Sequence, residues 1–114
     1  MSHSILEYLD HILIEASFLY EESQNLPFDE FIIDDTLTRA FLRSLEIIGE
    51  ASKNLPENFK VKHPEIEWKN MAGMRDKLIH SYFGVDYDIV WTVVQTKIPA
   101  LKQQIETIIQ DLEE

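Results

Sequence analysis

An arginine, a carboxylate, a histidine and a tyrosine fall within eight residues of this sequence, as Arg75, Asp76, His80 and Tyr82. The guanidinium of arginine offers a fork of donors that matches phosphate oxygens, and the imidazole of histidine exchanges protons near neutral pH. These residue types suit the cleavage of a phosphodiester bond, and they need no metal ion for it. The segment is therefore the candidate catalytic site. The alternative is structural, with Arg75 in a surface ion pair, His80 half-buried and satisfied, and Tyr82 in the core.

The residues around this segment predict that it lies at the end of a helix. Apolar side chains recur before it at helical spacing, and Gly84 followed by Asp86 is typical of a helix stop and a new N-cap. We therefore expect a helix from about Glu67 to Tyr82, with residues 81–85 as the exit. The candidate site would then occupy the last turns of a packed helix.

On an ideal helix the candidate residues do not share one face. Asp76 and His80 are four residues apart and face the same way, so the carboxylate would orient the imidazole. Arg75 and His80 differ by about 140° in azimuth. We expect them to meet either at a distorted helix end or across the two-fold axis of a homodimer. The dimer is the simpler way to build one site from this segment.

Three further stretches have the periodicity of amphipathic helices. The first begins at the Ser4 capping box, the second runs from about Phe28 to Asn54, and the third begins at Asp86. Pro99 predicts a kink or a restart in the third. A short helix is expected between Pro56 and about Lys62. The sequence therefore predicts an all-α fold, an antiparallel bundle of four main helices plus a short connecting helix.

Two local features bear on how these helices pack. Gly49 lies inside the second helix, where glycine costs about 1 kcal/mol relative to alanine, so it indicates either a close contact between helices or a merely tolerated glycine. Residues 90–94 are rich in β-branched side chains, but the helical period continues through them. No alternating strand pattern is found elsewhere, so we expect no strands.

Length and composition predict one domain spanning residues 1–114 that needs no disulfides, since 45% of the residues are hydrophobic and none is cysteine. The absence of cysteine suits a reducing cytoplasm, and the sequence shows neither a signal peptide nor a membrane span, so we expect a cytoplasmic protein. The formal net charge of -11 argues against general attraction to a polyanion and leaves a basic protein partner open. The four histidines show no metal-ligand spacing, so neither a metal nor another cofactor is expected.

Arg75, His80 and Tyr82 read as Arg-x4-His-x-Tyr, and the sequence around them resembles the HepT-like proteins of the HEPN superfamily. The resemblance covers nearly the whole chain. Its further matching blocks are residues 45–51, residue 68 with 72–76, and residues 82–86.

The resemblance implies a homodimeric ribonuclease toxin of a toxin–antitoxin pair. Its implied reaction is metal-independent RNA cleavage, in which the ribose 2′-hydroxyl attacks the adjacent phosphate. Arg75 and His80 would be catalytic in a cleft at the dimer interface, with His80 handling the proton and Arg75 holding the phosphate charge. Asp76 matches the polar residue that often follows the arginine. Whether dimers pair further stays open.

The resemblance gives Tyr82 a separate role, as the tyrosine that a partner antitoxin, a minimal nucleotidyltransferase, modifies with adenylyl groups. Ser81 departs from the pattern, since relatives often carry aspartate there. Two other readings remain open. The chain could be a non-catalytic subunit that presents substrate to a separately encoded nucleotidyltransferase, or a purely structural dimerisation module with a buried, mutually saturated Arg75 and His80.

Overall fold

The computed structural model describes residues 4–81 and 84–114, and at residues 80 and 81 it describes the backbone alone. The longer helices are α1 (Ile5–Glu22), α3 (Asp35–Asn54), α7 (Tyr87–Thr96) and α8 (Ile98–Glu113). The shorter helices are α2 (Phe28–Ile32), α4 (Glu57–Val61), α5 (Trp68–Ala72) and α6 (Met74–Leu78). Two short strands follow α6, namely β1 (Ile79–Ser81) and β2 (Gly84–Val85).

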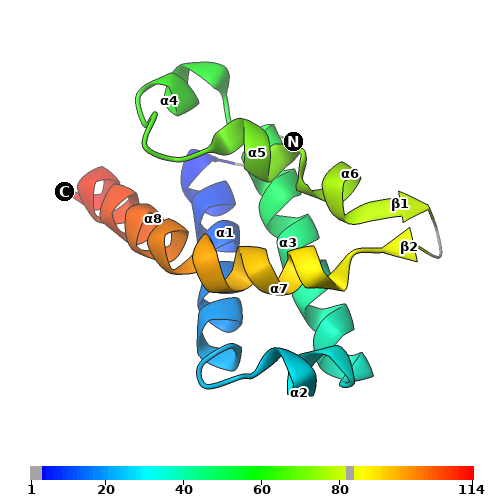
Figure 1. Ribbon diagram of the computed structural model, residues 1–114. Coiled ribbons are helices and arrows are strands. Elements are labelled where there is room, and N and C mark those ends of the chain that lie inside the picture. The colour runs from blue at the N-terminus through cyan, green and yellow to red at the C-terminus, as the bar shows by residue number, and fades with distance from the viewer. Residues whose placement is uncertain (1–3, 82–83) are drawn as a thin grey trace.

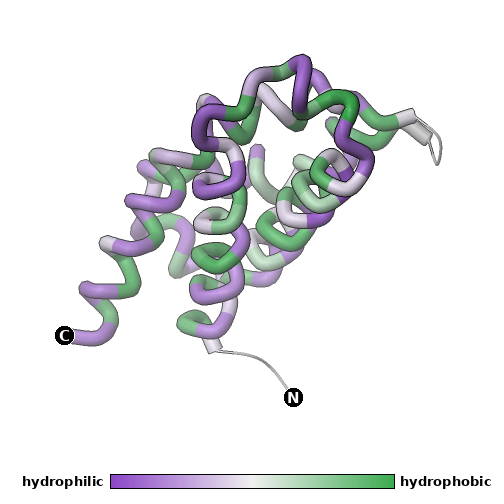
Figure 2. The backbone as a smooth tube through the Cα atoms, turned by 90° about the horizontal axis from the view of Figure 1, so that it is seen from below, coloured by the Kyte–Doolittle hydropathy of each residue, from purple (hydrophilic) through white to green (hydrophobic). Residues whose placement is uncertain are grey.

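Helices α1 and α3 form the centre of the molecule, with α8 packed on α1 and α5 packed on α3 (Figure 1). Each long helix turns an apolar stripe inward, which on α1 consists of Leu9, Ile12, Ala16 and Leu19. Hydrophobic and hydrophilic residues accordingly alternate along the helices with the helical period (Figure 2). The predicted all-α class is confirmed. None of the helices in the described part of the chain is long and apolar enough to cross a membrane.

Local signals at several helix ends are confirmed. The hydroxyl of Ser4 accepts a hydrogen bond from the Glu7 amide at 3.2 Å, and the Glu7 carboxylate accepts one from the Ser4 amide at 3.3 Å. This is the predicted capping box. Pro99 lies in the first turn of α8, so the chain restarts as a new helix there. The short connecting helix is α4.

The prediction of one helix from Phe28 to Asn54 is wrong, because the chain breaks between α2 and α3. Asp34 is the N-cap of α3, and its carboxylate accepts a hydrogen bond from the Leu37 amide at 2.9 Å. A side-chain acceptor at this position satisfies an amide that would otherwise lack a partner at the start of the helix. The break lets α2 turn aside and bury Phe31 in the core.

The prediction of one helix from Glu67 to Tyr82 is also wrong. Gly73 separates α5 from α6, and the helix ends at Leu78. The backbone then forms an antiparallel hairpin in which Ile79 pairs with Val85, and the expectation of no strands is corrected accordingly. Strands of three and two residues are too short to show an alternating pattern. Residue 82, the predicted end of the helix, lies outside the described residues.

Of the two explanations for Gly49, the close contact is confirmed. A Cβ built on Gly49 would lie 2.7 Å from the backbone carbonyl oxygen of Met71 in α5. Only glycine lets α3 and α5 approach so closely. This contact positions the short helices that lead into the candidate site.

Candidate active site

Arg75 projects from α6 toward α3 and is the best-defined member of the candidate site. Its Nε donates a hydrogen bond to Oε2 of Glu46 at 3.2 Å, across 29 residues of sequence. The arginine side chain is 67% exposed and the glutamate side chain 21% exposed. An ion pair this accessible to water contributes at most about 1 kcal/mol to stability. Its main effect is to orient the guanidinium.

A cleft with a volume of about 400 Å³ runs beside this ion pair, between α1, α3 and α6. Its polar and charged lining residues include Tyr8, His11, Arg43, Glu46, Glu50 and Arg75. Two cations and two carboxylates therefore share one depression on the surface. Such a site can bind a phosphate through its arginines and has an imidazole, that of His11, within its walls.

The surface ion pair that the structural alternative expects of Arg75 is present, because Arg75 pairs with Glu46 and stays 67% exposed. Apart from Glu46, the guanidinium has no polar partner among the side chains that the structure describes. A purely structural dimerisation module would require a buried and saturated arginine. In the single protomer the side chain of Arg75 is exposed, as an interface residue is before its partner binds.

The other predicted site residues are placed only in part. Asp76 follows Arg75 in α6 and is exposed. His80 lies in β1 and not on a helix, so the premise that Asp76 and His80 share a helical face is wrong. The predicted azimuth difference between Arg75 and His80 also assumed one continuous helix, so it does not apply, because α6 ends at Leu78. The side chains of His80 and Ser81 and the whole of Tyr82 lie outside the described part of the chain.

Several residues of the cleft were not singled out from the sequence. Arg43, Glu46 and Glu50 follow one another at spacings of three and four on the polar face of α3. That pattern was visible, but a charged helix face is usually just solvated. Nothing in the sequence pairs Glu46 with Arg75 or brings His11 to the same cleft, since both contacts depend on how α1, α3 and α6 pack.

Among the side chains that the structure describes, no group of three or more histidine, aspartate or glutamate residues could hold a metal ion. Any cofactor in the Arg75 cleft would have to bind through the arginines and the polar side chains already named.

An all-α fold with an exposed arginine in a charged cleft defines a class of small helical proteins, and the sequence comparisons identify the family. The profile described as "Ribonuclease HepT-like" matches residues 5–108. The chain therefore belongs to the HepT-like ribonuclease family.

Two relatives illustrate the similarity. A protein of Caldanaerobacter subterraneus subsp. tengcongensis, named "Putative RNase", is 55% identical over 103 residues, which cover 90% of this chain and 92% of the relative. A protein of Thermococcus cleftensis, named "Probable ribonuclease HepT", is 46% identical over 108 residues, covering 95% of this chain and 98% of the relative. No solved structure matches the chain.

Proposed function

We propose that this protein is a metal-independent endoribonuclease and the toxin component of a toxin–antitoxin pair. The observation that carries the proposal is the exposed guanidinium of Arg75, which Glu46 holds at the edge of a charged cleft. Membership in the HepT-like ribonuclease family supports RNA as the substrate.

In the proposed reaction the ribose 2′-hydroxyl attacks the adjacent phosphorus and the bond to the 5′ oxygen breaks, which leaves a 2′,3′-cyclic phosphate on one fragment and, after the 5′ oxygen takes up a proton from water, a 5′-hydroxyl on the other. His80 removes the proton from the attacking hydroxyl, a contribution of roughly 10²- to 10⁴-fold. The terminal nitrogens of Arg75 bind the phosphate oxygens and stabilise the charge that grows on them in the transition state. Asp76, exposed next to Arg75, contributes to the orientation of the reacting groups.

We propose a homodimer in which Arg75 of one protomer works with His80 of its partner. The support comes from an exposed apolar surface beside the cleft. Ile14 is 62% exposed and Phe18 37% exposed. Both lie on the same stripe of α1 as His11, which lines the cleft. Covering this stripe with a second copy would bury apolar surface and bring two clefts together.

Regulation in this proposal falls on Tyr82, two residues beyond His80 in the sequence. A partner nucleotidyltransferase attaches adenylyl groups to its hydroxyl. Each added nucleotide brings negative charge and bulk beside the site. The modification would therefore block the cleft and repel RNA phosphates.

The deciding experiment is an RNA cleavage assay with purified wild-type protein and His80→Ala, each with and without a metal chelator. The proposal expects cleavage that survives the chelator and disappears with the histidine. The chain would instead be a non-catalytic subunit if the wild-type protein leaves RNA intact while still binding a nucleotidyltransferase. Cleavage of equal rate by His80→Ala would contradict the proposed mechanism.

A further inference from the structure

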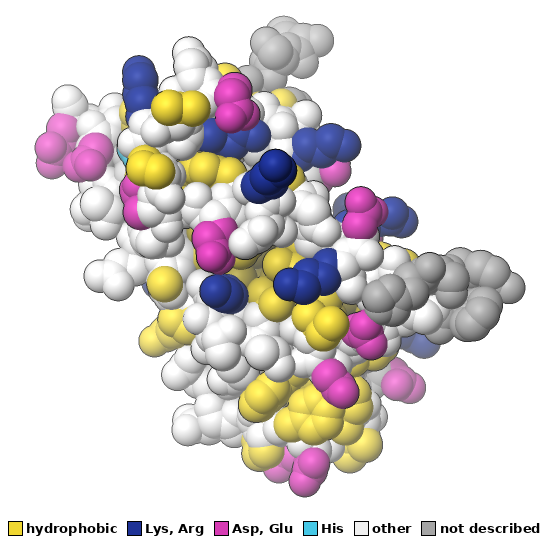
Figure 3. Space-filling view, turned by 45° about the horizontal axis from the view of Figure 1, so that its top comes forward, with side chains coloured by type: hydrophobic (Ala, Val, Ile, Leu, Met, Phe, Trp, Pro, Cys, Tyr) yellow, Lys and Arg dark blue, Asp and Glu magenta, His cyan; other side chains and the backbone are white. Residues whose placement is uncertain are grey.

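The positive charge of this acidic protein is confined to one part of the chain. Residues 39–102 contain all 10 basic residues and only 8 of the 21 acidic ones. Many of these basic side chains gather over one region of the surface, on the upper half of the face in Figure 3. The net charge of -11 therefore does not describe the local field in this region, which can attract an anion.

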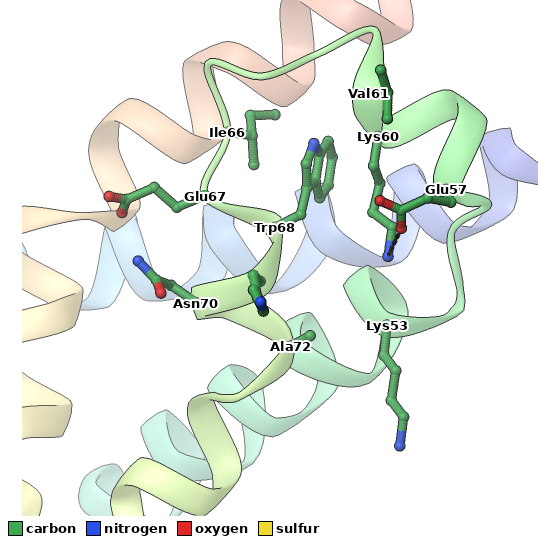
Figure 4. Close-up of a pocket in the computed structure, with 10 residues that line it drawn as sticks. Lys53, Glu57, Lys60, Val61, Ile66, Glu67, Trp68, Asn70 and Ala72 are labelled. Carbon is green, nitrogen blue, oxygen red and sulfur yellow. Dashed lines mark ion pairs between the residues drawn. The ribbon is translucent and has the colours of Figure 1, made fainter.

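A cavity of about 570 Å³ opens in this region, between the C-terminal end of α3, α4 and α5 (Figure 4). Its apolar wall contains Val61, Ile66, Trp68 and Ala72. The indole Nε1 of Trp68 donates to the carbonyl oxygen of His63 at 2.9 Å, which holds the ring in place. The cavity therefore combines a fixed apolar wall with a volume in the usual range for small-molecule sites.

Both acidic residues of the cavity already have partners. Glu57 pairs with Lys60 at 3.8 Å, and the Lys60 ammonium also donates to the carbonyl oxygen of Ser52 at 3.3 Å. Glu67 pairs with Lys97 at 3.4 Å. Neither carboxylate is left to neutralise the remaining lysines of the cavity.

Those remaining lysines are Lys53 and Lys69, and both are exposed. Neither forms an ion pair with any of the residues that the structure describes. The uncompensated charge of the cavity is therefore positive, and it stands next to an apolar wall. A ligand that complements both features has a flat apolar part and a phosphate, which is the chemistry of a nucleotide.

The cavity also lies in line with the Arg75 cleft. Glu46, which holds Arg75, and Lys53 are seven residues apart on α3, so they occupy nearly the same face at an axial separation of about 10 Å. A short stretch of single-stranded RNA spans that distance. We infer that this cavity is a subsite for one nucleotide of the RNA strand beside the cleavage position. The base would contact the wall around Trp68, and its phosphate would contact Lys53 and Lys69. The inference rests on the proposed ribonuclease function.

The test replaces both free lysines in the full-length protein, as Lys53→Gln with Lys69→Gln. Binding of a fluorescent single-stranded RNA is measured by anisotropy across a range of salt concentrations, in a His80→Ala background so that the RNA stays intact. Because both lysines contact the same phosphate in this proposal, their loss should reduce the slope of log affinity against log salt by about 0.7. In the otherwise wild-type protein the same pair should raise KM and leave kcat unchanged.

The matched control is Lys62→Gln with Lys102→Gln, which removes the same charge from residues that do not line this cavity. Its salt slope should stay at the value of the protein without lysine substitutions. If both double variants show the same fall in slope, the effect comes from net charge alone and the subsite is overturned. A wild-type slope in the Lys53→Gln, Lys69→Gln variant would also overturn the subsite.

The apolar wall is tested separately with Val61→Asn, because Val61 is 67% exposed and its replacement should not disturb folding. We expect weaker RNA binding with an unchanged salt slope, since no phosphate contact is lost. An unchanged affinity for RNA would mean that the base does not contact this wall, and it would contradict the inference.

Adenosine monophosphate and inorganic phosphate serve as competitors for the labelled RNA. Competition by the free nucleotide at the same concentration as unlabelled RNA would assign the cavity to a mononucleotide and overturn the RNA subsite. Competition by inorganic phosphate at that concentration would assign the cavity to phosphate alone and would also overturn the RNA subsite. If the protein fails to cleave RNA but shows the expected fall in slope, the proposed function fails and the nucleotide site stands. If the protein cleaves RNA normally but shows no fall in slope, the proposed function stands and the nucleotide site fails.

Discussion

The Arg75 cleft and the Lys53–Lys69 cavity lie along the same side of α3 and handle charge in different ways. In the cleft, Glu46 fixes the direction of the arginine, and Glu50 and Arg43 add further charges of both signs. In the cavity, the acidic residues pair with Lys60 and Lys97, and Lys53 and Lys69 have no ion-pair partner among the described residues. An arginine held in one orientation suits charge that appears at a defined position, whereas free lysines suit general attraction to phosphate. The comparison suggests a division between reaction and binding along one helix.

The largest expected effect comes from Arg75→Ala. Removing a donor that acts on transition-state charge should lower kcat by about 10²- to 10³-fold. KM for RNA should change little, because the lysine cavity is untouched. Steady-state kinetics on a defined RNA measure both constants. A variant in which KM rises and kcat is retained would reverse the roles assigned to the two regions.

The next largest effect is expected at Gly49, which lies between Glu46 and Lys53 on α3. In Gly49→Ala the new methyl group would meet the Met71 carbonyl oxygen at 2.7 Å, and a backbone atom cannot rotate away. We expect a loss of about 1–3 kcal/mol in the free energy of unfolding, measured by denaturant titration. Both regions should weaken together as α5 shifts.

Gly73→Ala is the matched control for this change. Its Cβ would lie 3.4 Å from the Lys69 carbonyl oxygen, which is close to ordinary contact. The backbone φ of Gly73 is -87°, which alanine adopts readily. Stability should therefore stay within about 1 kcal/mol of the starting protein. Equal losses at the two glycines would contradict the close approach of α3 and α5 as the cause.

Mixed dimers test whether the cleft is shared between protomers. Coexpressed Arg75→Ala and His80→Ala chains that pair at random should recover about a quarter of the wild-type activity, because half of the dimers contain one intact shared site. Differently tagged chains allow the mixed dimer to be purified and assayed alone. A mixed dimer without activity would place Arg75 and His80 of one site in the same protomer.

The smallest effect is expected for Glu46→Gln. The amide oxygen can still accept the Arg75 Nε, but the charge is lost, and an exposed pair of this kind contributes at most about 1 kcal/mol. The rate of RNA cleavage should fall by less than about fivefold. Glu50→Gln, which leaves the Arg75 contact intact, is the control. A loss as large as that of Arg75→Ala would make Glu46 a participant in the reaction itself.

Features set by neighbouring residues were predictable from the sequence. The Ser4 capping box and the restart at Pro99 depend on backbone groups within a few residues. The break at Asp34 was equally local but was missed, because apolar spacing continues across it. The hairpin after α6 could not be read from the sequence, since its strands are too short to show a pattern.

The candidate site also combines features that the sequence predicts with features that depend on how the helices pack. The motif Arg75, His80 and Tyr82 was visible in the sequence, and the family it implies is confirmed. The roles of these residues stay predictions. The Arg75–Glu46 contact joins residues 29 positions apart and exists only because α6 packs on α3. The positive charge of the cavity beside Trp68 likewise depends on tertiary contacts, since Glu67 pairs with Lys97 across 30 residues of sequence.

The backbone hydrogen bond between the Asp86 amide and the Leu78 carbonyl oxygen, at 2.9 Å, closes the base of the segment that carries His80. The chain therefore leaves the helical scaffold and returns to it at nearly the same point. A hairpin closed at its base in this way ties β1 to the end of α6 and the start of α7, so the backbone of His80 follows the position of these two helices.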